Sequence, residues 1–219
     1  MKRFWDLLLS FIALLLLSPV FLITALLIVI DSKGPVFFCP LRVGRYNRDF
    51  KLYKFRTMQV ENSTVKSNLT LGDSDPRITR IGKFLRKTKI DELPQLFNVL
   101  KGDISLVGPR PIMREFVEMY YEAYKPILAI RPGITSNASI FFRNEGKVLS
   151  QKADPEEYHR VVIMPKKIEL NLRYVYHRTL WSDFRILLLT LYCTLTDKNY
   201  QSTWLLKEPL IDDEGDFFK

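Results

Sequence analysis

Residues 4–30 read FWDLLLSFIALLLLSPVFLITALLIVI, and Asp6 is the only charged residue in this run. As one straight helix the run would extend roughly 39 Å, enough to cross a hydrocarbon core of roughly 30 Å with some tilt. A secretory signal peptide has a shorter apolar stretch that leads to a small-residue cleavage site, and neither property fits this run. The run therefore predicts a membrane element at the start of the fold.

Ser18-Pro19 lies near the middle of this run. A proline removes one helix hydrogen bond and pushes against the preceding turn, so it kinks or breaks a helix and would leave two arms of roughly 20 Å each. Lys2-Arg3 precedes the run and Lys33 follows it, and basic flanks on both sides favour two cytoplasmic ends. We therefore predict a re-entrant helix-break-helix over residues 1–32. A transmembrane helix is the alternative, because spanning helices tolerate proline.

The remaining residues, 33–219, are predicted to form one compact catalytic domain. The fold class expected for the whole chain is α+β and mainly helical, with short strands and amphipathic surface helices in this domain. The expected elements are strands at 36–38 and 50–55, a loop at 61–75, and helices after Asp75-Pro76, from Leu93-Pro94, over 115–130, after Asp154 and over 186–195. The last of these is too short to span a bilayer, so it is predicted to be a core or membrane-surface helix.

Charge and cysteine content restrict the partners and the compartment. The formal net charge is +9, and basic residues concentrate between Lys33 and Arg110, which indicates phosphates, nucleic acid or an anionic membrane face as partners. Cys39 and Cys193 form no CxxC pair, which favours a reducing compartment. With only two histidines, far apart in sequence, a His/Cys zinc site is not expected, and any metal would be a hard, oxygen-bound cation.

The sharpest local feature is the run Lys89-Ile90-Asp91-Glu92-Leu93-Pro94-Gln95. One interpretation is a helix N-terminus at which acidic residues complement the helix dipole. The other is a division of labour, in which one carboxylate is a nucleophile or Mg²⁺ ligand and the other carries a proton or orients a group. Arg86 and Lys87 precede the pair, and nearby cations would screen an aspartate from the phosphates that it attacks.

Two further segments carry cations that suit phosphate binding. On a strand, Lys54 and Arg56 would share one face, with aromatic residues on the other. Pro109 and Pro111 would hold Arg110 in an extended loop, and a preorganised arginine suits two-pronged recognition of phosphate. A solvated strand face and a plain turn are the alternative interpretations.

These pieces occur in a particular order along the chain, after the broken apolar run. The motifs are Tyr53-Lys54-Phe55-Arg56-Thr57-Met58, Asp75-Pro76-Arg77-Ile78-Thr79, Asp91-Glu92-Leu93-Pro94-Gln95, Asn98-Val99-Leu100-Lys101-Gly102-Asp103, Leu106-Val107-Gly108-Pro109-Arg110-Pro111 and Arg131-Pro132-Gly133-Ile134-Thr135. This order closely resembles the monotopic phosphoglycosyl transferases, the bacterial sugar transferase family that starts glycan assembly. The resemblance runs through nearly the whole chain.

The resemblance implies an enzyme that transfers a phosphosugar from a UDP-sugar to polyprenyl (undecaprenyl) phosphate and releases UMP. Asp91 would attack the β-phosphate and carry a covalent phosphosugar, Mg²⁺ would lie near Asp91, and Glu92 matches the family's second acid. The implied location is the bacterial inner membrane, with its lipid as a partner, a monotopic anchor broken at Ser18-Pro19, and the catalytic domain on the cytoplasmic face. Homo-oligomers are left open.

Several site residues are assigned by their place in these motifs. Lys54, Arg56, Arg86 and Arg110 occupy motif positions, and their roles as phosphate-binding residues are our inference from charge and placement. Many relatives follow Pro-Gly-Ile-Thr with a Gly-rich stretch that ends in Asn-Gly-Arg, whereas residues 136–145, which include Arg143, differ here. We expect this region to help define the nucleotide-sugar pocket, so the identity of the sugar is left open.

Two other classes of function compete with this prediction. A membrane-tethered basic adaptor for nucleic acid or anionic lipid fits the charge, but it leaves Asp91-Glu92 unexplained among so many cations. No nucleic-acid-binding motif is apparent, so we expect no nucleic acid partner. A structural subunit of an envelope glycan complex is the third class, and release of UMP from a UDP-sugar would separate the three.

Overall fold

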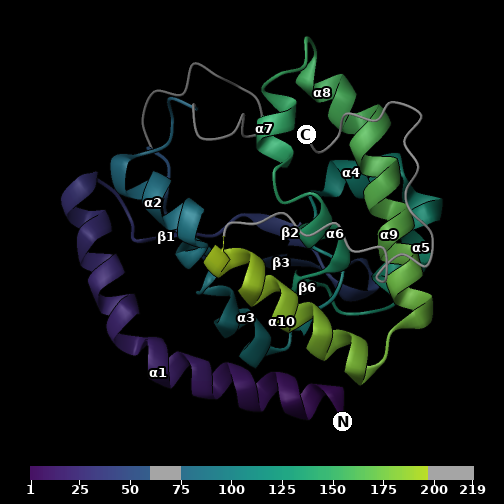
Figure 1. Cartoon of the computed structure of the whole chain (residues 1–219), viewed down its shortest axis with the longest axis horizontal. Helices are drawn as coiled ribbons and strands as arrows, with labels where there is room; N and C mark the ends of the chain where they lie inside the picture. The colour runs from purple at the N-terminus through teal and green to yellow at the C-terminus, as the bar shows by residue number, and fades with distance from the viewer. Residues whose placement is uncertain (60–74, 197–219) are drawn as a thin grey trace.

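The fold of this chain, taken from a computed structural model that describes residues 1–59 and 75–196, is mainly helical (Figure 1). The helices are α1 (Lys2–Asp31), α2 (Arg80–Thr88), α3 (Gln95–Lys101), α4 (Arg114–Met119), α5 (Tyr121–Leu128), α6 (Asn137–Phe141), α7 (Glu145–Leu149), α8 (Pro155–Tyr158), α9 (Met164–His177) and α10 (Leu180–Thr196). Short turns of other helix types are η1 (Arg45–Asn47), η3 (Ile90–Glu92) and η4 (His159–Ile163). The strands are β1 (Phe37–Phe38), β2 (Leu41–Val43), β3 (Asp49–Lys51), β4 (Lys54–Phe55), β5 (Ser105–Val107) and β6 (Gly133–Thr135).

Helix α1 is continuous through Pro19 but bends, and Figure 1 shows it turning upward after it has crossed the bottom of the molecule. A residue at position 19 would normally donate its amide to the carbonyl of Leu15, and proline has no amide proton to give. The Ser18 hydroxyl donates to that same Leu15 carbonyl at 2.8 Å. The predicted break is therefore a bend within one helix, and the Leu15 carbonyl still accepts a hydrogen bond there.

One face of α1 packs on the rest of the fold while the other is open. Asp6, Ser10, Thr24 and Ile28 are its buried residues, and large apolar side chains such as that of Leu16 stand exposed on the other side. Among the described residues, α1 is the one helix long and apolar enough to cross a membrane by length and composition. The apolar run thus forms a helix that packs along one side of the domain.

The strands that follow α1 form short antiparallel pairs around a tight turn. Strand β1 pairs with β4 and β2 pairs with β3, with Val43 opposite Asp49 at the turn. Tyr46 and Asn47 adopt positive φ values of 59° and 60° there, which lets the chain reverse within a few residues. The two predicted strands are confirmed, except that the second is divided into β3 and β4, and β2 is an additional strand that the sequence did not predict.

Helix α2 starts later than the sequence predicts. Thr79 is its N-cap and accepts a hydrogen bond from the Gly82 amide at 2.9 Å. The sequence predicts a helix directly after Asp75-Pro76, but the Asp75 carboxylate instead binds the Arg77 guanidinium, with 2.6 Å between Oδ2 and Nη2, and accepts the Arg77 amide at 3.0 Å. Asp75 therefore closes a local turn rather than a helix. The predicted loop at 61–75 lies almost wholly outside the described residues.

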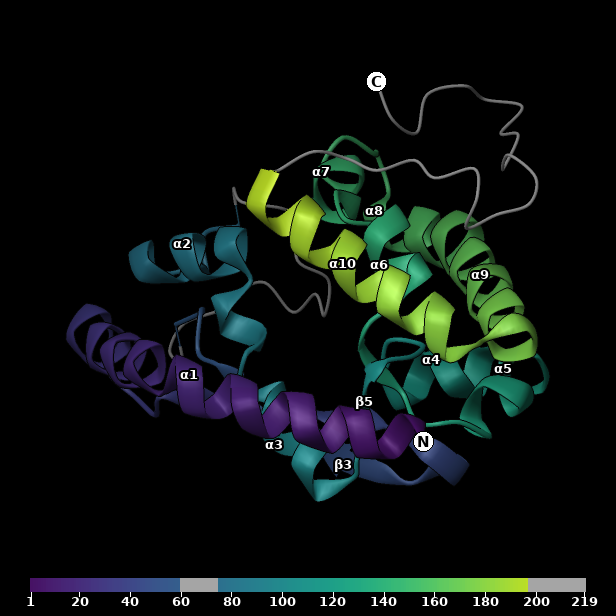
Figure 2. The same ribbon diagram turned by 60° about the horizontal axis from the view of Figure 1, so that its bottom comes forward.

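Helix α3 and the parallel pair β5–β6 form the centre of the fold. Helix α3 starts after Pro94, as the sequence predicts, and its C-cap is Gly102, whose φ is 96°. Gly108 and Gly133 allow the two strands to approach very closely, because a Cβ on Gly133 would lie 2.1 Å from the Gly108 nitrogen. Strand β5 contacts both α1 and α10, so it lies between the N-terminal and C-terminal helices (Figure 2).

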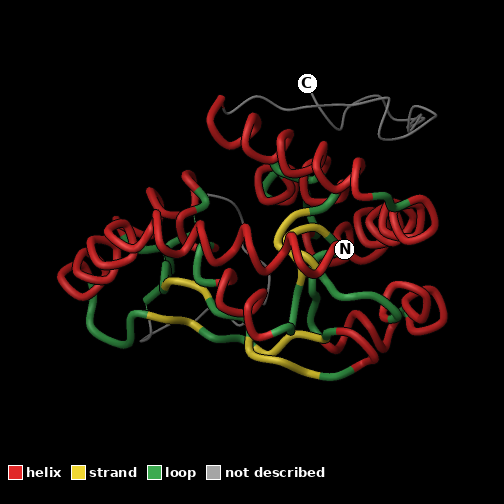
Figure 3. The backbone as a smooth tube through the Cα atoms, turned by 90° about the horizontal axis from the view of Figure 1, so that it is seen from below, coloured by secondary structure: helices red, strands yellow, loops and turns green. Residues whose placement is uncertain are grey.

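The C-terminal helices complete the domain around these strands (Figure 3). The helix predicted over 115–130 is divided into α4 and α5 at Tyr120, whereas Asp154 caps α8 as predicted, at 2.9 Å from the Glu157 amide. Helix α9 packs on α5, and α10 packs on α6, β5 and β6. Helix α10 covers the predicted segment 186–195 and buries Ile186 and Cys193, while side chains such as that of Leu191 face outward.

Candidate active site

The acidic pair lies on a single turn between two helices. Helix α2 ends at Lys89, which adopts a left-handed conformation with φ 59°, and η3 carries Asp91 and Glu92 directly into α3. Ile90 packs into an apolar cluster with Phe55 and Leu85, and this packing fixes the position of the turn. The chain therefore presents two adjacent carboxylates from a fixed turn, close to the start of α3.

Glu92 is held by two cations. Arg110 grips the carboxylate with both terminal nitrogens, with 3.0 Å between Nη1 and Oε2, and Lys54 Nζ lies 3.1 Å from Oε1. Burial alone would raise the pKa of Glu92, but the positive charges of Arg110 and Lys54 outweigh it and hold the pKa well below the usual value. Glu92 is therefore an ionised carboxylate with both oxygens already bound.

Asp91 has the opposite environment. It is 7% exposed, and its buried Oδ1 has no hydrogen-bond partner among the described residues. Burial, followed by the negative charge of Glu92, raises the pKa of Asp91, while Lys54, Lys89 and Arg86 act in the other direction. Asp91 thus keeps an uncommitted oxygen beside a neighbour whose oxygens are both occupied.

The cations that hold Glu92 are themselves fixed by backbone geometry. Burial lowers the pKa of Lys54, partly offset by the charge of Glu92, and Glu92 raises that of Arg110. Pro109 and Pro111 flank Arg110 as predicted, and the Pro109 carbonyl accepts the Gly133 amide at 2.9 Å. The loop between β5 and α4 therefore delivers the guanidinium to Glu92 from a rigid support.

Asn98 is a supporting residue to which the sequence analysis gave no role beyond its place in a motif. It is fully buried, its Nδ2 donates to the Lys51 carbonyl at 2.8 Å, and its Oδ1 accepts the Tyr53 amide at 2.8 Å. These two bonds join α3, which starts just after Glu92, to the segment just before Lys54. A buried side-chain amide that replaces backbone partners in this way fixes the relative position of the two segments.

The structure brings Arg86 to the pair but not Arg56. Arg86 lowers the pKa of Asp91 through its charge, and its Nε donates to the Thr57 hydroxyl at 2.9 Å. Arg56 is 4% exposed, and its guanidinium donates to the carbonyls of Ser32 at 2.6 Å and Lys33 at 2.7 Å. Lys54 therefore contacts the acidic pair, whereas the Arg56 guanidinium binds backbone carbonyls at the end of α1.

Arg143 lies in the turn between α6 and α7 and is half-buried. Its neighbour Glu145, which the sequence analysis did not select, lies 3.1 Å from His159 Nε2 and 2.6 Å from Lys167 Nζ. Burial would raise the pKa of Glu145, but the hydrogen bond with His159 and the charge of Lys167 lower it to about 2. Glu145 also contributes, as the smallest of several causes, to the raised pKa of Arg110.

The carboxylates limit the kind of metal site that the chain could build. Among the described residues, no group of three or more His, Cys, Asp or Glu side chains could hold a metal ion. Mg²⁺ is commonly held by one or two carboxylates together with water and substrate phosphates. The uncommitted Asp91 Oδ1 fits such a site, whereas Glu92 is occupied by Arg110 and Lys54.

Comparison with known proteins gives this arrangement a family. The model of the family described as "Bacterial sugar transferase" matches residues 1–197. The chain belongs to the bacterial sugar transferase family. The match covers every element described above that carries a side chain of the site.

Relatives in this family differ in length from the chain. It is 43% identical over 200 residues to UDP-N-acetylgalactosamine-undecaprenyl-phosphate N-acetylgalactosaminephosphotransferase of Aeromonas hydrophila, covering 89% of this chain and 44% of that protein. It is 38% identical to UDP-glucose:undecaprenyl-phosphate glucose-1-phosphate transferase of Escherichia coli, covering 90% of this chain and 41% of that protein. It is 37% identical to the uncharacterised sugar transferase EpsL of Bacillus subtilis, covering 93% of this chain and 91% of EpsL. The chain thus spans less than half of the first two sugar transferases and nearly all of EpsL.

Proposed function

We propose that this sugar transferase moves a phosphosugar from a UDP-sugar to undecaprenyl phosphate and releases UMP, as the first membrane step of glycan assembly. The observation that carries the proposal is the division between the two adjacent carboxylates: both oxygens of ionised Glu92 are bound by Arg110 and Lys54, while Asp91 keeps a buried oxygen without a partner among the described residues. The printed names of the Aeromonas and Escherichia relatives, which act with undecaprenyl phosphate, support this substrate class.

The first half-reaction uses Asp91 as the nucleophile. A carboxylate oxygen of Asp91 forms a bond to the β-phosphorus, and the bond between that phosphorus and the oxygen bridging to the α-phosphate breaks. UMP leaves with the electron pair, and the phosphosugar stays on Asp91 as an acyl phosphate. Lys54, Lys89 and Arg86 act on Asp91 with positive charge and so favour its ionised form against burial.

The second half-reaction restores the enzyme. A phosphate oxygen of undecaprenyl phosphate attacks the same phosphorus, the acyl-phosphate bond breaks, and Asp91 regains its carboxylate. The product is undecaprenyl diphosphate-sugar. Glu92 orients Arg110 and Lys54 throughout, because its low pKa keeps it ionised while both of its oxygens are bound.

Mg²⁺ is proposed as the cofactor, with Asp91 as its protein ligand. When bound, it supplies positive charge that stabilises the phosphate oxygens during transfer. Arg86 and Arg110 are proposed to contact phosphate oxygens, and Arg110 is suited to this because its side chain is 38% exposed even while it binds Glu92. Arg143, in the turn between α6 and α7, is proposed to contribute to the nucleotide-sugar pocket.

We also propose that α1 is a re-entrant helix in the bacterial inner membrane, with the domain on the cytoplasmic face. The bend at Pro19 and the basic residues at both ends of α1 support this arrangement. The exposed apolar side of α1 suits contact with lipid, since large apolar patches on a monomer mark interaction surfaces.

One assay tests the proposed reaction. Purified protein with Mg²⁺ and a panel of UDP-glucose, UDP-galactose and UDP-N-acetylgalactosamine should release UMP with at least one donor when undecaprenyl phosphate is present. Without the lipid, one sugar-phosphate mass should remain on the peptide that contains Asp91. An adduct on another residue would contradict the nucleophile, and absence of UMP release across a full donor panel would favour the adaptor or the structural subunit.

A further inference from the structure

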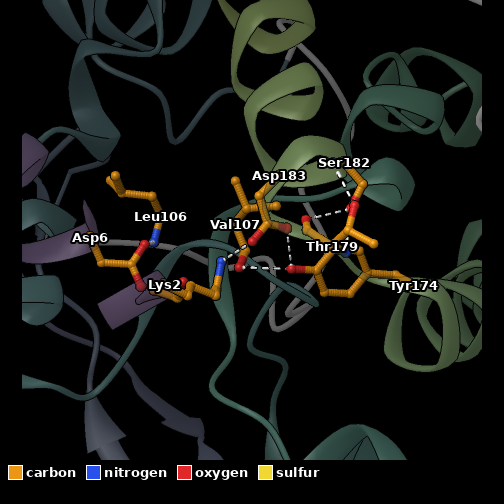
Figure 4. Close-up of polar contacts among 9 residues, drawn as sticks. Lys2, Asp6, Leu106, Val107, Tyr174, Thr179, Ser182 and Asp183 are labelled. Carbon is orange, nitrogen blue, oxygen red and sulfur yellow. Dashed lines mark hydrogen bonds and ion pairs between the residues drawn. The ribbon is translucent and has the colours of Figure 1, made fainter. Parts of the chain in front are cut away.

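Asp6 brings a carboxylate from the apolar helix α1 into the interior of the domain (Figure 4). It is 5% exposed, its Oδ2 accepts from the Ser105 hydroxyl at 2.8 Å, and its Oδ1 accepts from the Leu106 amide at 3.2 Å. A buried carboxylate is costly unless it is hydrogen-bonded, and leucine at position 6 would simply extend the apolar run. Anchoring in lipid alone therefore does not call for an aspartate here.

A second contact from the same arm of α1 is linked to the end of the same strand through Asp183 and Tyr174. Lys2 Nζ lies 2.5 Å from Asp183 Oδ2, and the Tyr174 hydroxyl lies 2.7 Å from Asp183 Oδ1 and 3.2 Å from the Val107 carbonyl (Figure 4). Together with Asp6, these groups contact β5 at each of its three residues. Strand β5 is therefore fixed by side chains of α1 and α9, with α10 contributing Asp183.

Strand β5 leads directly into the loop that carries Arg110. The Gly108 amide donates to the Thr135 carbonyl at 3.0 Å, and the Pro109 carbonyl accepts from Gly133 at 2.9 Å. The close approach of the two glycines and the fixed φ of the two prolines leave this connection little freedom. A displacement of β5 would consequently reach the Arg110 guanidinium.

The arm of α1 also holds the element on the other side of the ion pair. Arg3 Nη2 donates to the Val99 carbonyl at 2.7 Å, near the end of α3, which starts soon after Glu92. One arm of the apolar helix thus contacts both the helix that follows Glu92 and the strand that precedes Arg110.

We propose that Asp6 is a positioning residue for Arg110, so that docking of α1 on the domain sets the geometry of the Arg110–Glu92 pair. The catalytic consequence rests on the proposed function of Asp91 and Glu92. Packing of α1 on the domain is thereby linked to activity at the Asp91–Glu92 site, although α1 contributes no side chain to that site. A misplacement of about 1 Å in a catalytic group is enough to cost up to roughly a hundredfold in rate.

The test compares full-length Asp6→Leu, Asp6→Asn and wild-type protein in lipid nanodiscs. Asparagine keeps an oxygen for the Leu106 amide and offers Ser105 a donor, so Asp6→Asn should behave as wild type. Asp6→Leu should increase amide hydrogen exchange at residues 105–108 by at least about tenfold and lower turnover by about tenfold. Asp49→Asn is the matched control, because it removes an exposed carboxylate from a surface ion pair with Arg114.

A double-mutant cycle with Arg110→Lys distinguishes positioning from a general loss of stability. If Asp6 acts through Arg110, Asp6→Leu should lower turnover by less than about twofold in the Arg110→Lys background. If Asp6→Leu lowers turnover by the same factor in the wild-type and Arg110→Lys backgrounds, the proposal is overturned. Unchanged amide hydrogen exchange at residues 105–108 would overturn it as well. Should Asp6→Leu not fold, Ser105→Ala takes its place in the cycle. A wild type that releases no UMP would refute the proposed function, while the exchange measurement alone would still decide the positioning role.

Discussion

Arg110 and Glu92 form a two-pronged ion pair across 18 residues of sequence, and this pair leaves Asp91 as the carboxylate with an uncommitted oxygen. Adjacent acids in a cationic site could share a metal or a proton. Here Arg110 and Lys54 bind Glu92 and leave one oxygen of Asp91 without a partner among the described residues. The chemical roles of the two residues are thereby separated by their contacts rather than by their type.

The proposed nucleophile gives the first prediction. Asp91→Asn should lower turnover by at least about a thousandfold and abolish the covalent adduct, because an amide lacks the anionic oxygen. Glu92→Gln should also be severely impaired, yet some adduct should still form if Glu92 serves orientation. Intact-protein mass spectrometry after incubation with a UDP-sugar and Mg²⁺ measures both. Substantial turnover by Asp91→Asn with an unchanged fold would remove Asp91 from this role.

The second prediction concerns the shape of the cation at position 110. Arg110→Lys should lower turnover by roughly ten- to a hundredfold, because lysine keeps the charge but cannot grip Glu92 with two nitrogens. Steady-state kinetics measure the loss. Arg114→Lys is the matched control, since Arg114 binds the exposed Asp49 in a surface pair and should retain near-normal kinetics. Equal behaviour of the two variants would show that the planar fork at 110 is not needed.

Arg56 supports a third prediction, about stability rather than chemistry. Arg56→Met should lower the free energy of unfolding by about 2 kcal/mol, because the carbonyls of Ser32 and Lys33 lose their charged donors. Turnover per folded molecule should change little. Thermal melting and active-site titration separate the two effects, with the exposed Arg48→Met as control. A loss of turnover in fully folded Arg56→Met would restore the predicted substrate role.

The Glu145 cluster predicts a pH dependence of stability. The folded-state pKa of about 2 lies below the usual 4.5, so the stabilisation is present above pH 4.5 and is lost as the pH falls from about 4.5 towards about 2. The wild type should therefore exceed Glu145→Gln by up to about 3 kcal/mol near neutral pH, and the difference should shrink below pH 4.5. Melting across this range measures it.

The exposed Glu122→Gln is the matched control for that series, since Glu122 pairs with Lys125 on the surface. Its difference from wild type should stay small at every pH. A wild-type advantage over Glu145→Gln that stays constant between pH 6 and pH 3 would show that the carboxylate is not the source of the stabilisation.

The arrangement of α1 gives the last prediction. In a background of Cys39→Ser and Cys193→Ser, a cysteine in a short extension before Met1 and a second one at Lys33→Cys should both react with a membrane-impermeant thiol reagent from the cytoplasmic side only. The bend and the basic flanks give this expectation its physical basis. Labelling of the two positions from opposite sides would establish a spanning helix instead.

Sequence reasoning performed best where a feature is local. Asp91 and Glu92 are neighbours on one turn, and the Pro94 start and Gly102 end of α3 follow from proline and glycine geometry, so both were predictable. The grip of Arg110 on Glu92 was not, because charge alone does not distinguish a phosphate ligand from a partner of a carboxylate. Arg56 illustrates the same limit, because its charge does not distinguish a phosphate ligand from a partner of the backbone carbonyls at the end of α1.

Contacts between elements that lie far apart in the sequence could not be predicted from any local sequence pattern. Glu145 meets His159 and Lys167 through the packing of α7 on η4 and α9, and because these residues lie on three separate elements, no period within one helix or strand relates them. Asp6 appeared only as a charge near the edge of an apolar run, and its partners lie about 100 residues away. Such residues are identified by tertiary contacts, which a single sequence does not encode in any local pattern.

In the proposed re-entrant arrangement of α1, the hydrogen bond from the Ser18 hydroxyl to the Leu15 carbonyl has a consequence for the surrounding lipid. A bare carbonyl at the apex of a bend would draw water into hydrocarbon, since an unsatisfied backbone group there costs several kcal/mol. With serine in place, we expect the apex to stay dry in that arrangement, so that acyl chains can close over it without a water-filled defect. A sharp change of helix direction within a single leaflet then requires no local thinning of the membrane.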